Sequence, residues 1–371
     1  MIKRLLKMVI DRGRWNCVLM CALIVGSILS GCAKDDPTIE VPILESSGPQ
    51  PYFLEVPDHF PEPLIPNDKP MTVQGVELGR KLFYDPILSG DFTQSCASCH
   101  NQKFAFTDNG LRFSLGIDGI EGDRNSMAII NLAWGASFLW DGRSPTLESQ
   151  ALEPVPNPIE MHLAWSEAVE RLKNDADYPD LFDGAFPDQP ITSDLAANAM
   201  AQFMRSIVSG NSRYDAYVKR EGWARFTPDE ILGEQIYNSE VGDCFHCHGT
   251  ILLTDNEFHN NGLDSNVTGK GVGGVTGEPN QMGLFKTPTL RNVALTAPYM
   301  HDGRFNTLEE VVEHYSSGVK FSPTVDPLMK QVAQGGLQLS DDQKRQLVAF
   351  LKTFTDEDFL NNPTYADPQL D

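Results

Sequence analysis

Apolar residues recur at spacings of three and four in six segments of the 371-residue chain, a period that predicts amphipathic helices. Thr227 and Ser340 each precede acidic residues at the start of such a segment, as expected of capped helix starts. Strand patterns are sparse, so the sequence predicts a mostly α protein with long, ordered loops. The predicted helices are Val76 to Phe83, Ser166 to Asn174, Ser193 to Ser209, Pro228 to Tyr237, Thr307 to Tyr315 and Ser340 to Thr353.

The first 31 residues have the pattern of an export signal. A basic head precedes an apolar run from Val18 to Leu29, and Leu29-Ser30-Gly31-Cys32 resembles a bacterial lipoprotein cleavage box. The run is short for a membrane span, and a plain signal anchor is the alternative. We therefore expect cleavage before Cys32 and attachment of lipid to that cysteine.

The residues after Cys32 bear on where the protein is anchored. Ala33, in place of Asp, argues against retention at the inner membrane and favours the outer membrane. Lys34-Asp35-Asp36 resembles a tag that places some bacterial lipoproteins on the cell surface, although an acidic tether is the plainer explanation. We expect a lipid-anchored protein on the periplasmic side of the envelope, with surface display as the alternative.

Composition divides the remainder of the chain. Residues 32–70 carry many prolines and acids, which predicts a tether followed by an extended arm on the first domain. The next roughly 300 residues are enough for two domains, which we expect at residues 71–222 and 223–371.

The chain is strongly acidic. Its formal charge is −22, and removal of residues 1–31 takes away five basic residues and one acidic residue, which makes the charge −26. Such a field repels nucleic acid and favours a basic docking partner.

A Cys-x-x-Cys-His motif occurs twice, at residues 96–100 and 244–248. In this motif two thiols bond to a porphyrin and the adjacent imidazole binds its iron, so the sequence predicts two c-type haems. A redox dithiol or a zinc site could use Cys-x-x-Cys, but neither needs His directly after both pairs. The expected attachment residues are Cys96, Cys99 and His100 for the first haem, and Cys244, Cys247 and His248 for the second.

The repeat extends beyond the haem motifs. Leu-Gly precedes both motifs, at 78–79 and 232–233, and Asn131 and Asn292 each stand ten residues before an Asp-Gly-Arg sequence. In this register Tyr315 corresponds to Pro154, which cannot bind iron. If Tyr315 binds the second iron, the first iron stays open.

On these motifs the chain resembles the bacterial di-haem cytochrome c peroxidase family, and more narrowly its MauG-like branch. The resemblance covers about residues 76–355, with family motifs in order at 78–83, 140–143, 160–162 and 290–299. Family peroxidases usually carry a distal His where this chain has Ile117, and Met on the second haem where the register places Tyr315. His314 and Met300 are alternative ligands, and a packed core tyrosine is the alternative to iron binding at Tyr315.

The resemblance implies a function and site residues. Hydrogen peroxide would be reduced at the first haem, with Glu160 moving the proton, Gln150 orienting the substrate and Trp140 shortening the electron path between the haems. Electrons would come from a small cytochrome or another redox protein. Oxidation of a side chain on a partner protein, as in the MauG-like branch, and a di-haem electron carrier without peroxidase activity are the alternatives.

The resemblance also implies one calcium ion, held by the Asn125 side chain and the carbonyls of Thr296 and Pro298, since oxygen ligands suit a hard cation. Family members are often dimers, so a homodimer is a candidate assembly, although nothing in these residues shows an interface.

Overall fold

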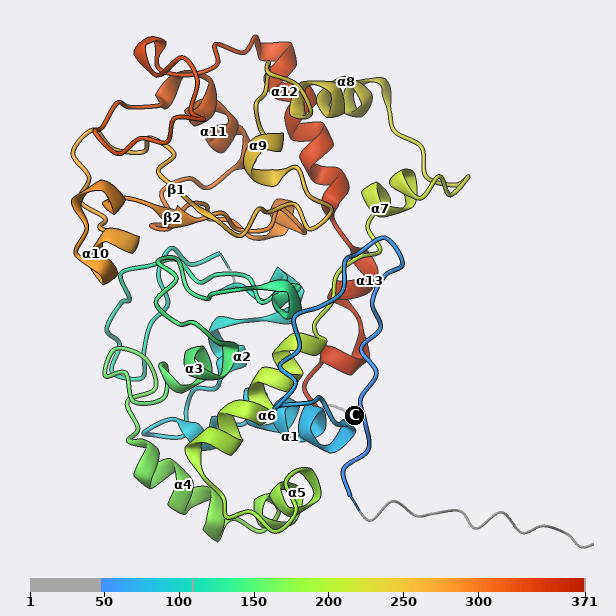
Figure 1. The fold of residues 1–371 in the computed structure, drawn as a ribbon, viewed down its shortest axis with the longest axis vertical. Coiled ribbons are helices and arrows are strands. Elements are labelled where there is room, and N and C mark those ends of the chain that lie inside the picture. Colours follow the sequence, from blue (N-terminus) through green and yellow to red (C-terminus); the bar gives the residue numbers. More distant parts are fainter. Residues whose placement is uncertain (1–47, 109, 370–371) are drawn as a thin grey trace, which may run out of the picture. The chain divides into compact units, whose positions relative to one another are not determined.

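The computed structural model describes residues 48–108 and 110–369 (Figure 1). Cys32, the export signal and the first part of the tether lie outside these residues. The α-helices are α1 Val73–Tyr84, α2 Cys96–Cys99, α3 Leu147–Leu152, α4 Trp165–Asn174, α5 Tyr178–Ala185, α6 Ser193–Ser206, α7 Arg213–Val218, α8 Pro228–Tyr237, α9 Phe245–His248, α10 Val272–Thr276, α11 Leu308–Glu313, α12 Asp341–Leu351 and α13 Glu357–Leu360. The strands are β1 Phe258–His259 and β2 Phe285–Lys286, which pair antiparallel with Phe258 opposite Lys286.

The prediction of a mostly α protein is confirmed, and each of the six predicted segments contains a helix. Thr227 and Ser340 both form capping boxes, in which the hydroxyl accepts from the third residue of the helix. The expected helix from Ser193 ends at Ser206, three residues early, and the one from Thr307 ends at Glu313. There the chain enters a π-helical turn, His314–Gly318, that includes Tyr315.

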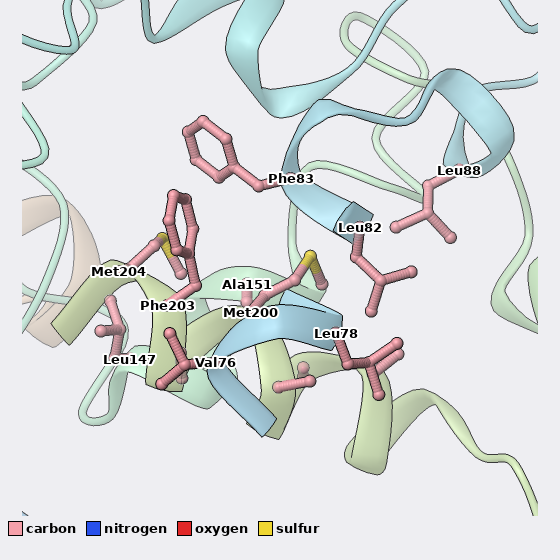
Figure 2. Close-up of a cluster of buried hydrophobic side chains, with 14 of the residues drawn as sticks. Val76, Leu78, Leu82, Phe83, Leu88, Leu147, Ala151, Met200, Phe203 and Met204 are labelled. Atoms are coloured by element: carbon pink, nitrogen blue, oxygen red, sulfur yellow. The ribbon is translucent and has the colours of Figure 1, made fainter. Parts of the chain in front are cut away.

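The first hydrophobic core forms where α1 crosses α6, with α3 beside them (Figure 2). Leu78, Leu82 and Phe83 of α1 are fully buried there with Phe203 of α6. Gly79 lies at the crossing, where a β-carbon would stand 1.9 Å from the carbonyl oxygen of Ala199. Only glycine lets the two helices approach this closely.

The second core repeats this arrangement with α8 and α12, and Phe350 and Phe354 lie at its centre. A β-carbon on Gly233 of α8 would stand 2.1 Å from the carbonyl oxygen of Gln346 on α12. The two Leu-Gly pairs of the sequence repeat therefore mark the same kind of helix crossing in each half.

The later part of the repeat also has the same backbone in both halves. Asn131 and Asn292 both adopt left-handed conformations, with φ of 55° and 59°, and each begins a 3-10 turn. The Asp-Gly-Arg glycines, Gly142 and Gly303, have φ of 68° and 59°. Capping boxes at Thr146 and Thr307 then start α3 and α11.

The arm of residues 48–70 contains no helix and contacts both halves. Leu64 donates its backbone N–H to Ala133, and the Trp134 indole donates to the carbonyl of Pro61. The Phe60 ring lies against the guanidinium of Arg291, 4.6 Å from ring centre to Cζ. At the other end of the chain, Phe359 and Tyr365 pack in the first core, so the boundary near residue 222 stays a prediction.

Within residues 48–108 and 110–369, none of the helices has the length and apolar character that a membrane crossing requires.

Candidate haem-binding sites

The first Cys-x-x-Cys-His motif lines a cavity of about 340 Å³. Cys96 and Cys99 begin and end α2, which is capped by Ser95, and His100 follows directly. The His100 Nδ1–H donates to the carbonyl of Phe106 at 2.9 Å. Burial lowers the pKa of His100, so the ring is neutral and its Nε2 is free to bind a metal.

The second motif lines a separate cavity of about 250 Å³ and has the same anchor. The His248 Nδ1–H donates to the carbonyl of Leu253, again at 2.9 Å, and burial lowers the pKa of His248. Both acceptor residues, Phe106 and Leu253, are in left-handed conformations, with φ of 57° and 56°. The two halves therefore present an imidazole Nε2 in the same way, as an iron ligand requires.

The protonation states and neighbours of the cysteines help to distinguish a haem site from the two alternative explanations of Cys-x-x-Cys, a redox dithiol and a zinc site. Burial raises the pKa of Cys96 and of Cys244 to about 12 each, which keeps both as thiols at neutral pH. A redox dithiol needs the opposite shift. Among the described residues, no acidic or imidazole side chain joins Cys96 and Cys99 in a metal-binding cluster, which also disfavours zinc at that motif.

Two of the predicted catalytic residues, Glu160 and Gln150, line the first cavity. Glu160 Oε1 accepts from the Asn157 amide at 2.6 Å, and burial raises the pKa of Glu160. The Gln150 amide has no hydrogen-bond partner in the described part of the chain and is available to a ligand. Asn157, which holds Glu160, was not predicted, because an Asn three residues before a Glu carries no distinctive signal.

Ile117 does not line this cavity. Its backbone N–H instead donates to the carbonyl of Glu160 at 3.0 Å. The preceding residue, Gly116, packs against the backbone of Ile159. A β-carbon on Gly116 would stand 2.3 Å from the carbonyl oxygen of Ile159. Of the described residues around the first cavity, His100 is the only histidine, so no second imidazole is positioned to bind a metal there.

Tyr315 and Met300 line the second cavity, whereas His314 does not. Burial raises the pKa of Tyr315 to about 12, and a hydrogen bond from Asn261 acts in the opposite direction. The π-helical turn gives Tyr315 its position, and such turns are frequent at functional sites. His314 Nε2–H donates to the backbone carbonyl of Asn261 at 3.0 Å, so this ring is engaged elsewhere.

The two cavities share a wall made of two chain segments, 125–128 and 286–289. Trp140 joins these segments. Its indole N–H donates to the carbonyl of Asn125 at 2.8 Å, and its own carbonyl accepts from the N–H of Lys286, also at 2.8 Å. Trp140 itself lines the second cavity.

The three residues expected to hold calcium, Asn125, Thr296 and Pro298, line the second cavity together. The Asn125 amide donates to the carbonyls of Leu111 and Arg112, which leaves its Oδ1 without a partner among the described residues. An amide oxygen of this kind is a donor that suits a hard cation.

A family model described as di-haem cytochrome c peroxidase matches residues 73–222. A curated relative that is 37% identical over 79% of the chain extends the match, and the chain belongs to the di-haem cytochrome c peroxidase family. Membership implies two c-type haems, a peroxide substrate and a redox partner.

The similar proteins include both MauG proteins and cytochrome c peroxidases. The methylamine utilization protein MauG of Methylorubrum extorquens is 37% identical over 294 residues, which cover 79% of this chain and 81% of that protein. The cytochrome c551 peroxidase of Pseudomonas aeruginosa is 32% identical over 296 residues, which cover 77% of this chain and 80% of that protein. The crystal structure of a MauG-like protein associated with microbial copper homeostasis superposes with a TM-score of 0.79 at 38% identity, covering 86% of this chain and 99% of that one.

Proposed function

We propose that this protein is a di-haem peroxidase with two haem domains in tandem, which reduces hydrogen peroxide to water in the first cavity. Electrons would pass through the second cavity from a donor cytochrome or another redox protein. The observation that carries the proposal is that Glu160 and Gln150 line the cavity of His100, and that no second histidine lines it among the residues that the structure describes. The haem bound there would supply the redox chemistry that splits the O–O bond.

Proton handling in this cavity falls to Glu160. Its carboxylate would accept a proton from one peroxide oxygen and return it to the other, which then leaves as water. With two electrons and two further protons, one peroxide gives two water molecules. Asn157 holds one carboxylate oxygen, and the Gln150 amide is available to orient the peroxide.

Trp140 is the proposed link between the two haems. It hydrogen-bonds to both segments of the wall that the cavities share, and an aromatic side chain there shortens each electron step. Core packing alone is the competing explanation of a half-buried tryptophan.

A second candidate function is the oxidation of a side chain on a partner protein. Tyr315 on the second cavity and Ile117 in place of a histidine favour it, and MauG proteins are among the relatives. The two functions differ in steady turnover with reduced cytochrome c, which a cytochrome c peroxidase sustains. Absence of such turnover, in a protein that still consumes peroxide, would favour oxidation of a partner. If neither reaction occurs, the protein is an electron carrier.

The decisive experiment is an electron paramagnetic resonance spectrum of the oxidised protein, with the Tyr315→Phe variant beside it. We expect one high-spin ferric signal from an open first haem and one low-spin signal that the variant alters. Two low-spin signals that are the same in the wild type and in the variant would mean that both irons are fully ligated, which contradicts an open peroxide site.

We also propose calcium binding at Asn125, Thr296 and Pro298. Protein purified without chelator should contain about one calcium ion per chain by elemental analysis, since oxygen donors suit a hard cation. Asn125→Ala should lose it, because the only side-chain donor of the three is removed. Calcium-free wild-type protein would contradict the site.

The location is likewise a proposal: export, and anchoring on the periplasmic side of the envelope through lipid on Cys32. Cys32→Ser should move the protein from the membrane fraction to the soluble fraction, because one acyl-bearing residue supplies the anchor. An unchanged distribution would contradict lipid anchoring.

A further inference from the structure

Asn261 lies between two candidate iron ligands on the wall of the second cavity. Its Nδ2 is 3.2 Å from the hydroxyl oxygen of Tyr315 and 3.4 Å from the sulfur of Met300. An amide nitrogen carries two hydrogens, so it can donate to both acceptors at once. All three residues line the same cavity.

Hydrogen bonds to the backbone of Asn261 and of its neighbour Gly262 hold Asn261 in this position. His314, next to Tyr315 in the π-helical turn, donates from Nε2 to the carbonyl of Asn261 at 3.0 Å. On the other side, the N–H of Gly262 donates to the Asn260 side chain at 3.0 Å, and the carbonyl of Gly262 accepts from Lys320 at 2.8 Å. The turn that carries Tyr315 therefore also fixes the residue that hydrogen-bonds to it.

The two acceptors differ in what a hydrogen bond does to them. A phenol oxygen is a good acceptor, and the hydrogen bond from Asn261 fixes the position of the Tyr315 oxygen on the wall of the second cavity. A thioether is only a weak acceptor, and the contact with the Asn261 amide occupies the sulfur of Met300 so that it is less available to iron. Phenolate ligands favour ferric iron and thioethers favour ferrous iron, so the choice of ligand sets what the second haem can do.

We propose that Asn261 is a positioning residue that selects Tyr315 over Met300 as the residue that would bind the iron of the second haem, with Met300 as the alternative ligand. This inference rests on the proposed di-haem function. The inference gives a role to both residues that the sequence analysis named as alternatives to Tyr315. His314 holds the backbone of Asn261 in place, and Met300 is the ligand that would replace Tyr315.

Backbone conformation does not explain the position of Met300 by itself. Met300 has a positive φ of 75°, but Leu139, at the same place in the first half, has φ of 69°. This conformation therefore belongs to the repeated turn. What distinguishes Met300 is its side chain and the contact with Asn261.

The test is Asn261→Leu, which has a similar size and no donors, with Asn266→Leu on the exposed part of the same loop as the control. We expect Asn261→Leu to retain both haems and to shift the ligand equilibrium about tenfold or more toward Met300, as loss of an outer hydrogen bond to a ligand does. The readouts are the low-spin ferric resonance, the thioether-to-iron absorption band and the reduction potential of the second haem. The control should match the wild type in all three.

Two further variants keep the inference testable if Asn261→Leu folds poorly. Tyr315→Phe should show the thioether signature, and Tyr315→Phe combined with Met300→Leu should lose it. A high-spin second haem in Tyr315→Phe would overturn the role of Met300, and wild-type spectra in a folded Asn261→Leu protein would overturn the role of Asn261. These readouts do not depend on peroxide turnover, so an inactive wild-type protein with the expected ligands would refute only the proposed function.

Discussion

Glu160 illustrates how a single residue acquires its properties from its surroundings. The backbone N–H of Ile117 fixes the carbonyl of Glu160, and Asn157 holds one carboxylate oxygen. Burial raises the pKa of Glu160, an effect that Asn157 and the more distant Arg143 partly offset. A carboxyl group whose pKa is moved toward neutrality is suited to accept and return a proton.

Glu160→Gln is expected to lower kcat/KM for peroxide by about 10²- to 10⁴-fold, since glutamine cannot carry the proton. In the wild type, Glu160 must be ionised to accept a proton, so turnover should fall as pH drops through its raised pKa. That limb of the pH profile should lie above the usual glutamate range of about 4.3 and disappear in the variant. Stopped-flow peroxide kinetics across pH would check this.

Glu170→Gln is the matched control, because Glu170 lies exposed on α4 and pairs only with Lys173 among the described residues. Its kinetics should equal those of the wild type. If Glu160→Gln kept the full rate and the acid limb, the proton would be carried by another group.

At the scale of elements, the two halves are organised by the same helix crossing. The glycines of the two Leu-Gly pairs lie where α1 meets α6 and where α8 meets α12, in contact with the backbone of the partner helix. A backbone atom cannot move aside as the end of a long side chain can. The spacing of the helices therefore depends on these two positions.

Gly79→Ala and Gly233→Ala should each lower the free energy of unfolding by about 1–3 kcal/mol or more, because the added methyl group forces the helices apart. Urea unfolding followed by circular dichroism would measure the loss. Gly184→Ala on α5 is the control: its β-carbon would have 4.0 Å to the nearest atom, a Gln74 side-chain carbon. That change should be neutral or stabilising by up to about 1 kcal/mol. Equal stabilities for all three variants would show that the helices tolerate separation.

At the scale of the whole described chain, one buried ion pair joins segments far apart in sequence. Arg291 donates two hydrogen bonds of 2.8 Å to Asp215 on α7, and both side chains are fully buried. His59 of the arm also bonds to Asp215, at 2.8 Å. Asp215 therefore ties together the arm, the first half and the second half.

This junction predicts a specific loss of stability in acid. Despite burial, which acts the other way, the hydrogen bonds from Arg291 lower the pKa of Asp215 to about 2, against about 3.9 in an unfolded chain. A lowered folded pKa means that the stabilisation is present above pH 4 and is lost as the pH falls toward 2. This difference in pKa corresponds to about 2–3 kcal/mol.

Asp215→Asn should therefore be less stable than the wild type at pH 6, by about 3–5 kcal/mol, since it leaves Arg291 buried without a counter-charge. The difference should shrink by about 2 kcal/mol as the pH falls from 4 to 2. Urea unfolding at a series of pH values would measure it, with Asp180→Asn, an exposed change on α5, as control. A difference that does not change with pH would mean that the carboxylate is not the titrating group.

The sequence by itself determined the features that depend on local pattern. Helical periodicity and capping residues gave the six segments in which helices formed, and the two Cys-x-x-Cys-His motifs with the internal repeat led to the family that the relatives confirm. The ends of helices were less accurate: the chain after Glu313 adopts a π-helical turn because tertiary contacts, such as that of His314 with Asn261, override the local period. The roles of Tyr315, Glu160 and the calcium residues remain predictions.

Only the tertiary structure decided which of these residues meet. Asn261 is 54 residues from Tyr315 and 39 from Met300, and Asp215 is 76 from Arg291, so no local pattern could pair them. The common wall of the two cavities likewise arises from packing of distant segments, as do the hydrogen bonds of Trp140 to both segments of that wall. Local sequence fixes helices and motifs because their contacts are a few residues apart, whereas a site depends on contacts that exist only once the chain has folded.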